Sequence, residues 1–221
     1  MKLTGLLTVV GLLLLSAASN AFGGSLNLAT GQNGSGGVWS SGDNPDAYWT
    51  VDPPGCTDPG CGAPVTAYTT FPDNVDWYGG WLANDSNSDW ITRDADITNN
   101  GPAPYTFYFT FDLTDTTDAS ITGGAFAVDD AGSVILNGNT LASVGAGNWG
   151  GLTSFSTTTS DFVSGLNTLE IEITDSDQFL EAVRLVGTLN GDVASTPEPA
   201  SWMLLMGGAL ALYFVRRKAT A

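Results

Sequence analysis

The sequence predicts an all-β protein, a jelly-roll-like antiparallel β-sandwich placed between two hydrophobic terminal segments. Three observations predict this fold. The 221 residues include 28 glycines and many Thr, Ser, Asn and Asp, a composition typical of numerous turns. Apolar and polar residues alternate along several segments, which is the period of a half-buried strand. Between the two ends of the chain, no window of the sequence has a sustained helical period.

Residues 1–21 have the features of a helical secretory signal peptide. Lys2 supplies the positive charge, and Leu6–Leu15 form an apolar stretch of about ten residues. Ser19-Asn20-Ala21 fits the small-x-small rule, so we expect a signal peptidase to cleave after Ala21. The alternative is an uncleaved anchor helix, which the short apolar stretch disfavours.

Strand patterns recur between residues 25 and 190. The strongest is Tyr105–Leu113, where aromatic residues and Leu occupy every second position. Thr168–Thr174 repeats this pattern, with Leu, Ile and Ile on one face and two Glu on the other. Asn137-Gly138 indicates a tight hairpin turn. Further strands are expected around Trp39 and at residues 47–51, 65–70, 120–128, 133–136, 153–158 and 180–189. Two packed antiparallel sheets would account for so many short strands.

Cys56 and Cys61 are the two cysteines of the chain, separated by four residues that include Pro59-Gly60. Export to an oxidising compartment favours a disulfide that closes this loop. A metal site would need further soft ligands, and the sequence has no other Cys and no His.

The charge of the central part excludes several functions. Residues 22–195 contain only Arg93 and Arg184 as basic residues, against 22 acidic ones, the 23 of the whole chain less Glu198. Nucleic-acid binding is excluded because it requires clustered Lys and Arg. The absence of His excludes a Ser-His-Asp triad and imidazole zinc ligands. Divalent cations are natural partners of such a charge.

Two kinds of candidate ligand residues follow. Asp129 and Asp130 offer the hard oxygen ligands that Ca²⁺ prefers, although Asp residues in this position also cap tight turns. The side chains of Trp81, Trp90 and Trp149 could stack on sugar rings, or they could plug the ends of the sandwich.

Catalysis is not expected. Glu170 and Glu172 share one strand face and could imitate a glycosidase pair. Their alternation with Leu169, Ile171 and Ile173 is equally explained by an ordinary strand with one face in solvent. We therefore expect no enzymatic activity and no cofactor other than a candidate Ca²⁺.

Residues 196–221 form a tail with three parts in a fixed order. Pro197-Glu198-Pro199 cannot be helical and leaves an extended segment. Ala200–Val215 has no charge and would span roughly 24 Å as a helix, a short transmembrane segment. Arg216, Arg217 and Lys218 follow and should remain cytoplasmic.

This tail resembles the PEP-CTERM sorting signal of Gram-negative bacteria. The resemblance implies a membrane-embedded processing enzyme, an exosortase, that cleaves near Pro197-Glu198-Pro199 after transient anchoring in the inner membrane. It also implies delivery to the cell surface, the outer envelope or an exopolysaccharide matrix. A plain C-terminal anchor after a proline-rich linker is the alternative.

The region from Tyr105 to Leu189 resembles galactose-binding-like jelly rolls of exported bacterial proteins, with an immunoglobulin-like sandwich as the other candidate fold. The segment Trp81–Ile91 is similar to one that is common in PEP-CTERM ectodomains. Together the resemblances imply a non-catalytic surface or matrix protein of three parts, 1–21, 22–195 and 196–221. Its body would bind extracellular polysaccharide, or it would serve adhesion and biofilm cohesion without a specific ligand.

Overall fold

The computed structural model describes residues 24–56, 60–70, 80–97, 103–174 and 180–194. Residues Phe22–Val193 form one compact unit. The expected signal peptide, and the tail with its transmembrane helix, lie outside the described residues, so the boundaries at residues 21 and 195 stay predictions. In the described part of the chain, no helix has the length and apolar character needed to cross a membrane.

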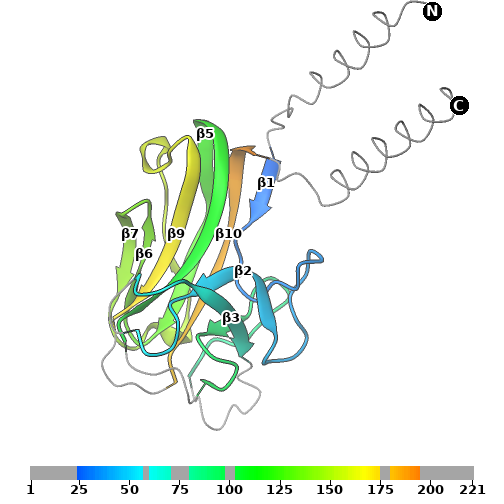
Figure 1. Ribbon diagram of the computed structural model, residues 1–221, viewed down its shortest axis with the longest axis vertical. Coiled ribbons are helices and arrows are strands. Elements are labelled where there is room, and N and C mark those ends of the chain that lie inside the picture. Colours follow the sequence, from blue (N-terminus) through cyan, green and yellow to red (C-terminus); the bar gives the residue numbers. More distant parts are fainter. Residues whose placement is uncertain (1–23, 57–59, 71–79, 98–102, 175–179, 195–221) are drawn as a thin grey trace, which may run out of the picture. The chain divides into compact units, whose positions relative to one another are not determined.

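The described strands confirm an all-β antiparallel sandwich, joined by two single-turn 3₁₀ helices (Figure 1). In chain order the elements are β1 (Gly24–Asn27), β2 (Pro45–Val51), β3 (Val65–Thr70), β4 (Trp90–Thr92), β5 (Tyr105–Asp129), β6 (Gly132–Leu136), β7 (Asn139–Val144), η2 (Asn148–Gly150), β8 (Thr153–Ser154), η3 (Thr159–Asp161), β9 (Gly165–Ile173) and β10 (Ala182–Val193). The strand order is β1-β10-β4-β3-β2-β5-β9-β6-β7, and β8 pairs with β5.

The long strand β5 is the central strand of the fold and pairs with β2, β8, β9 and β10 (Figure 1). Its first half pairs with all of β9, from Tyr105 opposite Ile173 to Leu113 opposite Gly165. Its second half pairs with β10, and β10 also pairs with β1 and β4. One strand therefore joins the parts that the sequence presented as two separate strands, 105–113 and 120–128.

The core is the alternating face that the sequence predicted. Leu169, Ile171 and Ile173 are fully buried in β9, and the inward aromatic residues of β5 pack against them. The core of this cluster also includes Leu28, Trp49, Val51, Phe126, Val134, Leu136, Val183, Leu185 and Leu189. Burial of this apolar surface, worth about 25 cal/mol per Å², is the main stabilising contribution.

The hairpin between β6 and β7 confirms the turn predicted at Asn137-Gly138. Both residues have positive φ, 51° and 81°, as a type I′ turn requires. The Asn137 amide also donates to the backbone oxygen of Asp161 and to the side chain of Asn167, while its oxygen accepts the N–H of Thr168. This one side chain ties the turn to the neighbouring loop and to β9.

Other expectations needed adjustment. Residues 153–158 form a strand only at β8, and Trp39 lies beside an isolated bridge between Gln32 and Val38. Strands β1, β4 and β7 were not predicted. β1 and β4 are three or four residues long, too short to show a period, and β7 lacks strict alternation of apolar residues.

Candidate functional site

An open polar hollow of about 430 Å³ lies where β1, β5 and β10 meet two loops. Its lining includes no charged and no aromatic side chain. It consists of Asn27, Ala29, Gln32, Gly36, Gly37, Val38, Ser86, Asn87, Thr122, Gly123, Val186, Gly187 and Thr188. The volume lies in the range of small-ligand sites, about 300–1,000 Å³.

Gln32 is the fixed element of this hollow because its side chain is only 2% exposed and bonded at both ends. Its Oε1 accepts a hydrogen bond from Asn27 Nδ2 at 3.1 Å, and its Nε2 donates to the backbone oxygen of Asn87 at 3.4 Å. Asn27 Oδ1 in turn accepts the N–H of Ala29. The amide groups are thus held in place before any ligand arrives, which lowers the ordering cost of binding.

Two buried carboxyl groups, those of Asp46 and Asp89, pack against the turn that carries Gln32. Asp46 accepts the N–H groups of Gly31 and Gln32 with one oxygen and those of Tyr48 and Trp49 with the other. Burial raises the pKa of the Asp46 carboxyl, although these four donors oppose the change. A carboxyl group therefore shapes one wall of the hollow without reaching its surface.

Asp89 packs against the same turn and is 1% exposed. Its N–H donates to the backbone oxygen of Thr30, and the Thr30 hydroxyl donates to the backbone oxygen of Asp89 at 2.6 Å. A Cβ added at Gly31 would lie 2.5 Å from Asp89 Cβ, and φ of Gly31 is +83°, so only glycine fits there. Burial raises the pKa of Asp89 to about 7; Arg184 opposes this shift, and the carboxyls of Asp85 and Asp46 add to it.

The fully buried Arg184 holds the loop before β4. Its guanidinium forms an ion pair with Asp85 at 2.8 Å and donates to the Ser88 hydroxyl and to the backbone oxygen of Ala83. Asp85 also accepts the N–H groups of Asn87 and Ser88. These bonds set the position of Ser86 and Asn87 at the rim of the hollow.

This loop is part of the segment Trp81–Ile91, and the side chains of the segment hold the local structure together. Asn84 accepts the N–H of Trp90 and donates to the backbone oxygen of Thr70. The indole rings of Trp81 and Trp90 lie 4.5 Å apart, and the Trp90 N–H donates to the backbone oxygen of Leu82. Trp90 is fully buried, which leaves no ring face for a sugar and places it in the core, the alternative that the sequence left open.

Trp81 and Trp149 are half-buried and pack against the small cluster of Trp90, Ala127 and Ala182. The Trp149 backbone oxygen accepts the N–H of Leu82. Neither ring lines the polar hollow. A role of Trp81 or Trp149 in ligand binding stays a prediction, and it would involve a part of the surface outside the polar hollow.

Asp129 and Asp130 follow at the end of β5. Asp129 Oδ2 accepts the indole N–H of Trp81 at 2.8 Å. Among the described residues, no group of three or more His, Cys, Asp or Glu is arranged to hold a metal ion. Calcium binding at this pair stays a prediction and would need ligands from carbonyl oxygens or water.

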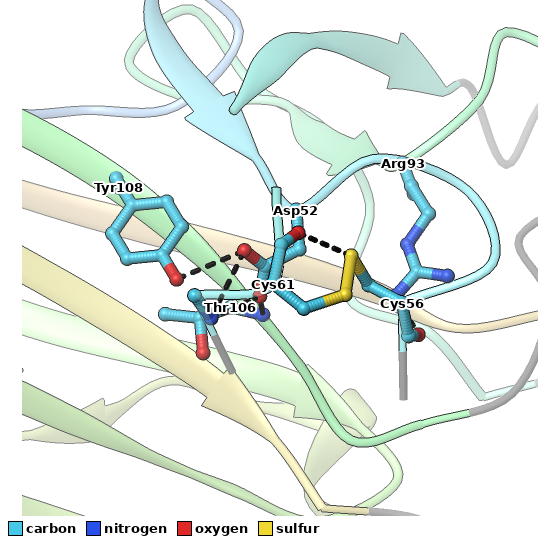
Figure 2. Close-up of a disulfide and its surroundings, with 7 residues drawn as sticks. Asp52, Cys56, Cys61, Arg93, Thr106 and Tyr108 are labelled. Atoms are coloured by element: carbon cyan, nitrogen blue, oxygen red, sulfur yellow. Dashed lines mark hydrogen bonds between the residues drawn. A yellow bond between two sulfur atoms is a disulfide. The ribbon is translucent and has the colours of Figure 1, made fainter. Parts of the chain in front are cut away.

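The predicted disulfide between Cys56 and Cys61 is confirmed, with 5.7 Å between the Cα atoms. Figure 2 shows Asp52 beside this bridge, with Tyr108 and Thr106 around its carboxylate. Asp52 is fully buried and accepts the Tyr108 hydroxyl at 3.0 Å, the Thr106 N–H at 2.9 Å and the Gly60 N–H. The carboxylate thereby fastens the disulfide loop to β5.

Arg93, on the other side of this loop, is a buried structural cation. Its guanidinium carbon lies 3.5 Å from the centroid of the Tyr105 ring, and its Nη2 donates to the backbone oxygen of Cys56. Stacking of this kind is a favourable cation–π contact. Burial raises the pKa of the Tyr105 hydroxyl well above its usual range, and the nearby Glu181 carboxyl adds to this effect.

Glu170 and Glu172 lie on the outer face of β9 and are half-buried. In the sheet, Glu170 lies opposite Tyr108 of β5, and Glu172 lies opposite Thr106. Burial, and then the charge of Glu172, raises the pKa of Glu170. Two neighbouring carboxylates on the outer face of a sheet have these properties, in agreement with an ordinary strand that has one face toward solvent.

Residues 195–218 match the PEP-CTERM protein-sorting motif, which confirms the resemblance seen in the tail. The chain is therefore an all-β protein with a C-terminal export and sorting signal, an exported protein that is processed at a membrane. Comparison with curated proteins finds no match. Among solved structures, a family 35 carbohydrate-binding module from an environmental isolate matches at 7% identity, with 43% of this chain and 73% of that chain covered and a TM-score of 0.29.

The residues of the hollow were not predicted from the sequence. They come from four separated stretches, 27–38, 86–87, 122–123 and 186–188, and only the fold brings them together. A partial signal was present in the run of glycines and amides from Gly31 to Gly37, which is unusual for a simple turn. Ser86 and Asn87 lie in the segment Trp81–Ile91, in which only the tryptophans were considered as candidate ligand residues.

Proposed function

We propose that the body of this exported protein binds a polysaccharide at the cell surface or in the extracellular matrix and performs no catalysis. The observation that carries the proposal is the polar hollow, in which the amides of Asn27 and Gln32 are held in place and other polar side chains lie next to small apolar patches. Sugars need both kinds of contact, because their hydroxyls require hydrogen bonds and their C–H faces require apolar surface. The hydrogen bonds that Asn87 and Thr188 form with the described residues involve their backbone atoms, which leaves their side chains available to a ligand.

The route of the protein follows from its sorting motif. A signal peptidase would release the N-terminus, and an exosortase would cleave near Pro197-Glu198-Pro199 while the tail is held in the inner membrane of a Gram-negative cell. The product would then reside on the cell surface, in the outer envelope or in an exopolysaccharide matrix. The matched motif supports this route.

A second candidate is a structural role in adhesion or biofilm cohesion without a specific ligand. One observation favours it: among the described residues, Tyr48 is the sole exposed aromatic side chain of the sandwich. Aromatic platforms are a common means of binding sugars, and this surface offers few.

A glycan array separates the two candidates. The processed protein, recovered from the culture and checked for a cooperative melting transition, should bind at least one glycan class saturably. An array without signal from a folded sample would contradict ligand binding and favour the structural role.

A further inference from the structure

The body of the protein presents no cationic side chain to solvent. Arg93 and Arg184 are the only basic residues between positions 22 and 195, and both are described by the structure. Their side chains are 1% and 0% exposed. Arg93 is stacked on Tyr105, and Arg184 is paired with Asp85. Arg and Lys side chains are the strongest direct partners of a carboxylate, sulfate or phosphate group, because they form bidentate or charge-assisted hydrogen bonds with it.

Three carboxyl groups also lie close to the hollow, of which that of Asp85 is paired with Arg184 and that of Asp89, with a pKa of about 7, is only partly ionised at neutral pH. Asp46 lies directly behind Gln32, Asp89 lies behind Gly31, and Asp85 precedes Ser86 at the rim. An anionic group placed in the hollow would gain no ion pair there and would be repelled by those of the neighbouring carboxyls that are ionised. The rest of the body, with 22 acidic residues, adds a repulsive field over a longer range.

We infer that the hollow binds a neutral saccharide and rejects acidic ones. This inference rests on the proposed function and adds the class of ligand and the residues that select it. Neutral sugars carry hydroxyls that both donate and accept, and they match side chains of the same dual character. Asn87 and the hydroxyls of Ser86 and Thr188 provide such groups, and Gln32 holds the rim in position.

The shape of the hollow fits a sugar ring in a second respect. Gly36, Gly37, Gly123 and Gly187 line it without side chains, so a ring can approach the backbone closely. Val38, Val186 and Ala29 provide apolar contact for the C–H face.

The test compares one polysaccharide in two charge states. Polygalacturonate and its carboxyl-reduced form have the same linkage and differ in the charge at C6. Binding of the processed protein to both is measured by affinity electrophoresis and calorimetry, with EDTA present so that divalent cations cannot bridge carboxylates. Neutral hits from the glycan array, each paired with an oxidised uronic-acid form, are measured in the same way.

Two double variants locate the site. Asn87→Ala with Thr188→Val removes two polar groups of the hollow and should weaken binding of the neutral glycan by about tenfold or more. Asn139→Ala with Thr140→Val makes the same chemical changes on the exposed strand β7 and should leave binding unchanged. A melting curve of each variant confirms that it is folded.

The outcomes separate the two ideas. Tighter binding of neutral forms, lost in the first variant alone, supports the inference. Equal or tighter binding of acidic forms in EDTA overturns it and leaves polysaccharide binding intact. Neutral binding that survives in the Asn87→Ala, Thr188→Val variant overturns the placement in this hollow. If no glycan of either kind binds, the proposed function fails and this inference fails with it.

Discussion

At the level of single residues, Asp89 makes the stability of the protein depend on pH. Its pKa is about 7 in the folded protein, against about 3.9 in an unfolded chain. Folding therefore takes up a proton between these values, and the stability that is full below pH 4 is lost as the pH rises through 7. A shift of this size corresponds to a few kcal/mol, on the order of 1.4 kcal/mol per pH unit.

We expect Asp89→Asn to remove most of this dependence. The melting temperature of the wild-type protein should fall between pH 4.5 and 7.5 by several degrees more than that of the variant, at about 2–4 °C per kcal/mol. Asp118→Asn, a change at an exposed carboxyl of β5, is the matched control and should follow the wild type. Parallel curves for Asp89→Asn and the wild type would show that Asp89 does not titrate in this range.

Trp90 and Trp149, two of the three tryptophans that the sequence offered for sugar stacking, should differ in their contribution to stability. Trp90 is fully buried, so Trp90→Ala should cost about 3–5 kcal/mol of unfolding free energy. Trp149 is half-buried at the edge of the same cluster, so Trp149→Ala should cost clearly less. Urea denaturation measures both values, and equal costs would contradict the different burial of the two rings.

Calcium binding at Asp129 and Asp130 has a direct test. If the pair forms a site, millimolar Ca²⁺ should raise the melting temperature by mass action on the folded state. The Asp129→Asn, Asp130→Asn double variant should lose most of this gain. An equal gain in the variant, reproduced by NaCl of the same ionic strength, would instead indicate screening of the acidic body.

At the level of elements, the β6–β7 hairpin depends on the conformation of its turn. Gly138 has φ of +81°, and a Cβ placed there would touch nothing within 4 Å, so substitution adds backbone strain and no clash. Gly138→Ala should therefore cost about 1 kcal/mol. Gly145→Ala, also at an open position but with no positive φ, is the control and should be neutral or slightly stabilising by denaturant titration.

Elements with strong local patterns were predictable, and those held by distant contacts were not. Alternation identified β9 and the first half of β5, and Asn137-Gly138 identified the hairpin, because each signal lies within a few residues. The joining of two segments into β5, and the strands β1 and β4, depend on pairing with β10 far along the chain. The hollow belongs to this second kind, since Asn27, Asn87 and Thr188 approach one another only through those pairings.

At the level of the whole molecule, the two ends of the precursor should both be removed. We expect intact-mass analysis of the extracellular protein to find neither residues 1–21 nor residues 202–221. Glu198→Ala should leave precursor in the inner membrane, since it alters the matched sorting motif. Recovery of the complete C-terminal segment from the matrix fraction would contradict processing at this motif.

The pairing of β1 with β10 has a consequence for engineering. Gly24 lies opposite Gly191, so the first strand of the body starts beside the place where the last strand finishes. A short glycine-rich linker between Val193 and Gly24 could close the body into a ring, and new termini could be opened in the exposed turn at Gly138. Such a circular permutant would keep the other strand pairings and would move both termini of the body from the β1–β10 pair to the β6–β7 turn.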